Sequence, residues 1–97
     1  MNPYSIEKVP SDILEETAQK ARSIRKRKGW SQAELAERSG VSLGSLKRFE
    51  QRGHISFLSL LKLAHVLGRL SDFEPLFAVS EDLDKVKALF SSGSTKH

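Results

Sequence analysis

The chain has 97 residues, which is enough for one small domain with a single core. It holds no cysteine, which excludes disulfides and thiol chemistry, and its three histidines are too scattered along the sequence to indicate a metal site. No stretch approaches the roughly 20 apolar residues of a membrane span, and the first residues lack the basic start and apolar block of a signal peptide. We therefore expect a protein of the cytoplasm, with no cofactor, no metal and no membrane partner.

The net charge is +4, and the charges are unevenly distributed. Residues 1–69 contain 13 basic and 7 acidic side chains, whereas residues 70–97 contain 3 basic and 5 acidic ones. Within the basic part, residues 20–28 hold six lysines or arginines and no acid. Such an excess of positive charge indicates a polyanion as partner, although the same side chains can also form an ordinary solvated helix face.

The first part of the chain predicts an arm followed by a helix. Residues 1–10 show no clear period and are expected to form the arm. A helix is expected from Ser11, whose side chain can cap it, to the glycine at position 29. Its apolar positions recur at steps of three and four, as on one face of a helix. These positions are Leu14, Ala18, Ala21 and Ile24.

Two further helices are predicted by their caps. Ser31 and Glu34 form a capping box, which starts a second short helix, Gln32–Ser39. A three-residue turn follows, after which Ser42 caps a third helix that runs to about Glu50. The pattern of short helix, tight turn and short helix leaves few loops free for another role.

The rest of the chain is also expected to be helical. A fourth helix is expected from Ser56 to Gly68, and a last amphipathic helix from Glu81 to Phe90. Residues 91–97 are rich in Ser and Gly and are expected to be a disordered tail. We see no strand pattern. The predicted architecture is all-α with five or six short helices, in which a domain at 11–70 is followed by a helical extension at 71–90.

The segment from Ile24 to Ser42 resembles the Cro/repressor-type (Xre) helix-turn-helix. Several features coincide: an arginine before the glycine, the pattern Ser-Gln-x-x-Leu-Ala, the turn Gly-Val-Ser, then Leu46 and the Phe49-Glu50 pair. The resemblance extends from about Ala21 to Leu70. It implies a lambda-repressor-like DNA-binding domain, with the helix-turn-helix at about 32–50, whose partner is double-stranded operator DNA.

The third helix is the expected recognition helix. At 100° per residue, its apolar side faces inward and Lys47 and Arg48 point outward, where they can reach guanine O6 and N7 or phosphates. Leu43 can touch a thymine methyl. Gly44 either lets the backbone approach the DNA or is simply a neutral surface position. The family often has polar base readers such as glutamine at these last two positions. Their absence here shifts readout to the two cations or to DNA shape.

The resemblance implies roles for residues outside this helix face. In the family, the glutamine that matches Gln32 contacts a phosphate, and the residues that match Arg25 and Glu50 form an ion pair between the first and third helices. Arg25 is therefore expected to be structural first and a phosphate contact second. Ser42 and Ser45 can combine capping with phosphate contact. General electrostatic attraction to DNA is expected from Lys26, Arg27 and Lys28.

The segment 45–61 and the segment 68–77 resemble the HipB-like branch of this family. That resemblance implies an antitoxin that represses its own operon, acts as a homodimer and binds a HipA-like kinase toxin. The alternative is a stand-alone or phage-type repressor with no toxin partner. The apolar residues between Leu70 and Phe90 are expected to supply the dimer contact, although a toxin would compete for the same residues. No catalytic residues are expected, because the sequence has no nucleophile–base pair, metal cluster or phosphate loop.

Overall fold

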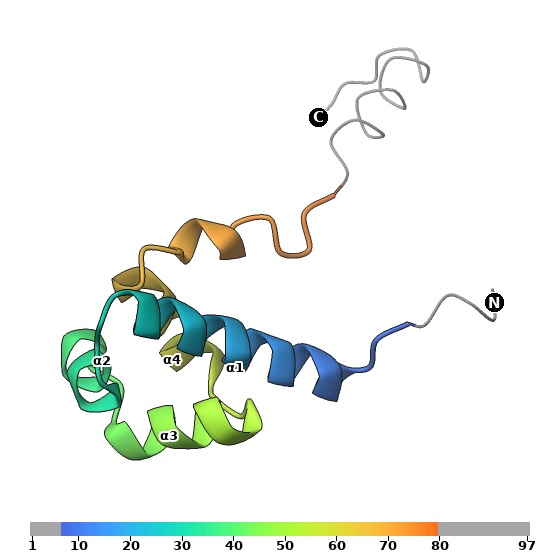
Figure 1. The fold of residues 1–97 in the computed structure, drawn as a ribbon. Coiled ribbons are helices and arrows are strands. Elements are labelled where there is room, and N and C mark those ends of the chain that lie inside the picture. The colour runs from blue at the N-terminus through green and yellow to red at the C-terminus, as the bar shows by residue number, and fades with distance from the viewer. Residues whose placement is uncertain (1–6, 80–97) are drawn as a thin grey trace, which may run out of the picture.

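The computed structural model describes residues 7–79 and contains helices and turns without any strand in that range. Figure 1 shows the helices, and their bounds are α1 (Pro10–Arg27), α2 (Gln32–Ser39), α3 (Leu43–Arg52), α4 (Phe57–Val66) and a 3₁₀ helix, η1 (Leu70–Phe73). The all-α class is confirmed. Within the described residues the chain forms four α-helices and one short 3₁₀ helix, so the expected five or six helices are not matched there. Most of the predicted arm, the predicted helix at 81–90 and the tail at 91–97 lie outside the described residues.

Helix α1 starts differently from the prediction. Its N-cap is Val9 and its first residue is Pro10, so Ser11 lies inside the helix and does not cap it. Proline suits this first position because it has no N–H to satisfy and its φ is already close to helical. The carboxylate of Asp12 accepts a hydrogen bond from the backbone N–H of Val9 at 3.0 Å. The prediction of a serine cap was wrong because the proline and the aspartate together supply the start.

The next three helices begin as serine caps predict. Ser31, Ser42 and Ser56 each accept a hydrogen bond from the backbone N–H three residues later, at 3.0–3.1 Å. Helix α2 has the predicted bounds, whereas α3 continues two residues beyond the predicted end. Gly40 and Gly53 end these two helices in the left-handed conformation, with φ of 77° and 80°.

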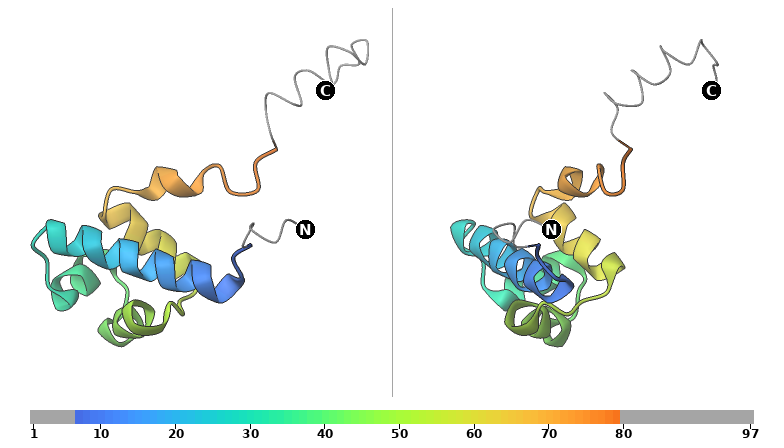
Figure 2. Two further views of the ribbon diagram at one scale, coloured as in Figure 1. Left: turned by 45° about the vertical axis from the view of Figure 1, so that its right-hand side comes forward. Right: turned by 90° about the vertical axis from the view of Figure 1, so that its right-hand side faces the viewer.

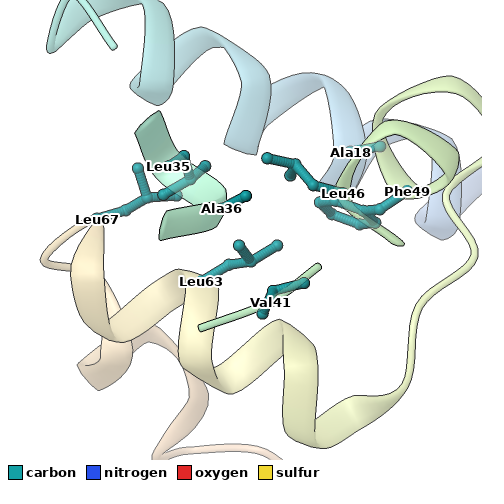
Figure 3. Packing of buried hydrophobic residues seen from close by; sticks show 8 residues of the cluster. All are labelled: Ala18, Leu35, Ala36, Val41, Leu46, Phe49, Leu63 and Leu67. Carbon is teal, nitrogen blue, oxygen red and sulfur yellow. The ribbon is translucent and has the colours of Figure 1, made fainter. Parts of the chain in front are cut away.

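A single apolar core holds the four α-helices together. Figure 3 shows its buried side chains, which are Ala18, Leu35, Ala36, Val41, Leu46, Phe49, Leu63 and Leu67. They come from all four helices and from the turn between α2 and α3. Because two of them, Leu46 and Phe49, lie on α3 and are only 1% exposed, one side of α3 is fixed against the domain.

The end of α3 also touches the first helix directly. A Cβ atom at Gly53 would lie 2.7 Å from the backbone oxygen of Leu14, a distance that real Cβ atoms do not show. Glycine is therefore required here for two reasons, the close approach of α1 and the positive φ. This contact sets the position of the loop that leads from α3 to α4.

The extension after α4 lies away from α3. In all three views, η1 lies above α1 and α3 lies below it (Figures 1 and 2). Phe73 of η1 packs edge-on against Phe57 of α4, with ring centroids 6.1 Å apart. The domain therefore has two separate sides, one formed by α3 and one by η1.

Candidate nucleic-acid interface

A buried ion pair joins α1 to α3. The guanidinium of Arg25 donates two hydrogen bonds to the carboxylate of Glu50, from Nε at 2.8 Å and from Nη2 at 2.9 Å. The side chains are only 8% and 4% exposed. Nη1 of the same arginine donates to the backbone oxygen of Trp30 at 2.8 Å. Arg25 is thus held by structural partners on both sides of its planar group, as the family resemblance implies for this pair.

Gln32 belongs to the same network. Its amide nitrogen donates to Oε1 of Glu50 at 2.9 Å, which ties the first residue of α2 to α3. The sequence analysis assigned Gln32 to a phosphate and did not foresee this bond. A buried carboxylate has more acceptor sites than one guanidinium fills, so a further donor is to be expected near Glu50. The amide retains a second hydrogen, which can still be offered to a phosphate.

The outward side of α3 carries the predicted DNA-binding residues. Lys47 and Arg48 are exposed, whereas the side chains on the inward side are buried. Leu43, the first residue of α3, is 37% exposed. A Cβ atom at Gly44 would meet no atom within 4 Å, so the space beside this residue is open. The structure thus brings these four residues together on one surface of one helix.

The two serines at the start of α3 bond to each other. Ser42 accepts the backbone N–H of Ser45 at 3.1 Å, and its hydroxyl donates to Oγ of Ser45 at 2.9 Å. Ser42 is therefore fully used as a cap. Ser45 keeps its own hydroxyl hydrogen, which is free to turn outward.

A surface hollow lies beside α3, between Arg48 and the first turn of α4. Its volume is about 260 Å³, and it is lined by Ser45, Arg48, His54, Ile55, Ser56 and Ser59. The first N–H groups of a helix have no partners inside the helix, and they give its start a partial positive charge. The hollow therefore combines an arginine with a helix N-terminus, which favours an anion.

Several residues that line the hollow were missed from sequence. Ser56 was expected only as the start of the fourth helix, whereas His54 and Ser59 belong to a loop and to a first turn and do not stand out in a helical pattern. The available signal is the serine cap of α4, which places a helix start only a few residues after the recognition helix. Their position beside Arg48 depends on how α4 folds back relative to α3, and the spacing of residues in the sequence does not predict this.

The basic cluster at the end of α1 is exposed. Lys26, Arg27 and Lys28 all lie on the surface. Nζ of Lys28 lies 5.3 Å from the centre of the Trp30 ring, and Cζ of Arg38 lies 4.4 Å from it. Arg38, which was not selected from the sequence, therefore lies on the same tryptophan as Lys28, and its charge is paired with Glu34 at 3.2 Å.

Comparison with known families identifies the fold. Residues 22–73, more than half of the chain, match the family model described as helix-turn-helix. The chain belongs to this helix-turn-helix family. Its members are DNA-binding domains of the Xre and Cro type, so the predicted family and the DNA-binding class are confirmed, while the match does not distinguish the HipB-like branch. Neither the curated proteins nor the solved structures compared with the chain gave a match.

The described part of this helix-turn-helix protein lacks two other features. Within residues 7–79, no three or more His, Cys, Asp or Glu side chains are grouped so that they could hold a metal ion. No helix in the same range has the length and apolar character needed to cross a membrane.

The helix-turn-helix geometry fits a DNA groove. Helix α3 has 10 residues and is therefore about 15 Å long. A helix of this size can enter the major groove of B-DNA, which is about 12 Å wide. With α3 in the groove, its outward residues face base edges, and the residues at its margins face the phosphate backbone.

Proposed function

We propose that this protein is a sequence-specific DNA-binding regulator of transcription, and that it represses by placing α3 in the major groove of operator DNA. The observation that carries the proposal is the outward side of α3, where Lys47 and Arg48 are exposed above a buried apolar side. In a helix-turn-helix chain, such a surface supplies both the charge that attracts DNA and the side chains that reach it.

The two cations of α3 have different surroundings, and we assign them different roles. Lys47 is exposed and is not among the residues that line the hollow, and its ammonium group can reach O6 or N7 of guanine. Arg48 lines the hollow next to the start of α4. There a phosphate would meet a planar guanidinium beside the positive end of the α4 dipole. Of the two partners expected for Arg48 from the sequence, a guanine or a phosphate, the hollow favours the phosphate, as a backbone contact beside the groove.

The remaining backbone contacts follow from the same placement. The second amide hydrogen of Gln32 and the hydroxyl of Ser45 can each reach a phosphate, and the exposed cluster of Lys26, Arg27 and Lys28 strengthens attraction without selecting a sequence. Glu50 fixes Gln32 relative to α3 through the 2.9 Å hydrogen bond. The phosphate contact of α2 and the groove contact of α3 are thus held at a constant separation.

The proposal is tested by selecting bound fragments from the source genome and measuring affinity for the best site by fluorescence anisotropy. Lys47→Ala should weaken that site by about 1–3 kcal/mol and relax the preference at one base pair. Arg48→Ala should weaken all sequences and lower the salt slope by about one. Lys62→Ala, an exposed lysine of α4, removes the same charge and serves as the control. If all three variants lower the affinity by the same factor and none changes the base preference, the placement of α3 in the major groove is wrong.

We also propose that the protein acts as a homodimer through the surface formed after α4. Four apolar side chains are exposed there, at 41% for Leu70, 51% for Leu76, 102% for Phe77 and 67% for Val79. A second copy is the commonest partner for such a surface, and two half-sites about one helical turn apart would add the contacts that one module lacks. The surface lies away from α3, so a partner there leaves α3 free (Figures 1 and 2).

The dimer is tested by sedimentation equilibrium of the full chain and of a variant with Leu76→Asp and Phe77→Asp. The wild type should sediment as a dimer and the variant as a monomer that binds its operator more weakly. A wild-type chain that remains a monomer at high concentration would contradict the dimer and would leave the exposed side chains for another partner.

An antitoxin role is the second candidate function. It is favoured by the resemblance of segments 45–61 and 68–77 to HipB-like proteins and by an apolar surface that does not overlap α3. If a kinase-like gene lies beside the gene for this chain, co-expression of the two proteins should give a complex that still binds the operator. Absence of such a gene, or of a complex, favours the stand-alone or phage-type repressor.

A further inference from the structure

The start of α3 combines an exposed leucine with a glycine that the fold does not need. Leu43 is 37% exposed on a helix whose other outward residues include two cations. Gly44 has the ordinary negative φ of a helix, and a Cβ atom there would meet nothing within 4 Å. Alanine would therefore fit this position, and it would stabilise a helix better than glycine does.

The polar groups at this end of α3 are largely used inside the protein. Ser42 caps the helix through the N–H of Ser45 and donates its hydroxyl to the same serine. The side chain that extends from the first turn toward a groove is therefore the apolar one of Leu43. The bare backbone at Gly44 removes the obstacle beside it, so this turn can lie closer to the bases than a turn with two full side chains.

From these two observations we infer that the first turn of α3 reads a thymine by its 5-methyl group. The methyl group of thymine is the apolar feature that unmodified DNA presents in the major groove, and an exposed leucine next to a glycine is shaped to cover it. Gly44 provides the close approach that such a contact needs, because van der Waals contact is lost within a fraction of an ångström. Each operator half-site therefore contains a thymine opposite Leu43, beside the base pair that Lys47 contacts. This inference rests on the proposed DNA-binding function.

The experiment replaces single thymidines of the selected operator with deoxyuridine, which removes the methyl group and leaves the hydrogen-bonding groups. With the wild-type protein, replacement of one particular thymine in each half-site should lower the affinity about fourfold. This is the value expected for the loss of one buried methyl-sized group. With Leu43→Ala, the same replacement should change the affinity less than about 1.5-fold, since the group that covers the methyl is gone. Ile13→Ala removes a side chain that is 49% exposed on α1, and it should keep the full fourfold response.

A second variant tests the approach of the backbone. Gly44→Ala should leave the melting temperature unchanged or raise it, while lowering operator affinity about tenfold because the added methyl group holds the helix away from the bases. Since the variant remains folded, loss of structure does not account for that result. Unchanged affinity of Gly44→Ala, or a deoxyuridine scan with no response above 1.5-fold, overturns the inference.

Failure of the inference is distinguishable from failure of the proposed function. If no sequence is enriched by the wild-type chain, and Lys47→Ala binds as the wild type does, then α3 does not read DNA at all. If a site is enriched and requires Lys47 but the deoxyuridine scan is flat, the function stands and only the thymine contact is wrong. If Leu43→Ala retains the fourfold response, another residue covers the methyl group.

Discussion

Glutamine in place of Glu50 should destabilise the domain far more than its small change in shape suggests. The carboxylate accepts three hydrogen bonds, two from Arg25 and one from Gln32, and the arginine side chain is only 8% exposed. Removing the negative charge leaves a guanidinium buried without an ionic partner, which costs about 3–5 kcal/mol in comparable sites. We expect about 3 kcal/mol, because the amide oxygen of glutamine can still accept one of the bonds. That is a large part of the roughly 5–15 kcal/mol that stabilises a small domain.

Urea unfolding followed by circular dichroism measures this loss. With a denaturant slope of about 1–1.5 kcal/mol per molar for so small a domain, the midpoint should fall by about 2–3 M. Glu34→Gln is the matched control, because Glu34 pairs with Arg38 at 3.2 Å while the two side chains are 41% and 50% exposed. That exposed pair should contribute less than about 0.5 kcal/mol. Equal stability losses in the two variants would refute the claim that burial makes the Arg25–Glu50 pair different.

The joint replacement of both partners separates charge from packing. Arg25→Met with Glu50→Leu removes both charges and leaves side chains of similar bulk, so it should be much closer to the wild type in stability than Glu50→Gln alone. The stability loss of the double variant is compared with the summed losses of the single variants Arg25→Met and Glu50→Leu. If the two values are equal, the residues act independently and the ion pair does not account for the loss in Glu50→Gln.

Further predictions concern the glycines, the basic cluster and a cap. Gly53→Ala should lower the free energy of unfolding by at least about 3 kcal/mol, because of its positive φ and the collision with Leu14. Gly40→Ala, at a position with a similar φ but open space, should lower it by about 1–2 kcal/mol in the same urea assay. Lys26→Ala should weaken binding to all DNA sequences equally and lower the salt slope by about one in anisotropy titrations. Ser56→Ala should cost about 1 kcal/mol of stability and also weaken DNA binding at low salt, because its cap orders the first turn of α4 beside the hollow.

The sequence predicted the structure best where the structure depends on residues that are close together in the chain. Serine caps and glycine stops are local, so α2 was predicted with its observed bounds and the starts of α3 and α4 were placed at the correct serines. The cap of α1 was misplaced by two residues, at Ser11 instead of Val9, because two plausible start signals, Pro10 and Ser11, lie side by side. Only the structure shows that Asp12 reaches back to the N–H of Val9 and so favours the proline.

Contacts between distant elements were harder to foresee. The pairing of Arg25 with Glu50 was expected through the family resemblance, but the further donor, Gln32, depends on where α2 begins relative to α3. The hollow beside Arg48 likewise requires α4 to return to the end of α3. Sequence also could not decide which apolar residues after α4 are covered. Phe73 packs against Phe57, whereas Phe77 is fully exposed.

The network around Glu50 links the stability of the domain to its recognition of DNA. One carboxylate holds Arg25 at the end of α1, Gln32 at the start of α2 and its own helix α3 within hydrogen-bonding distance. The phosphate contact proposed for α2 and the base contact proposed for α3 would therefore belong to one rigid unit. A change at Glu50 should then weaken all DNA sequences by a similar factor, because it disturbs the spacing of both contacts. A change at Lys47 should alter the preference at one base pair instead, because it leaves that spacing intact.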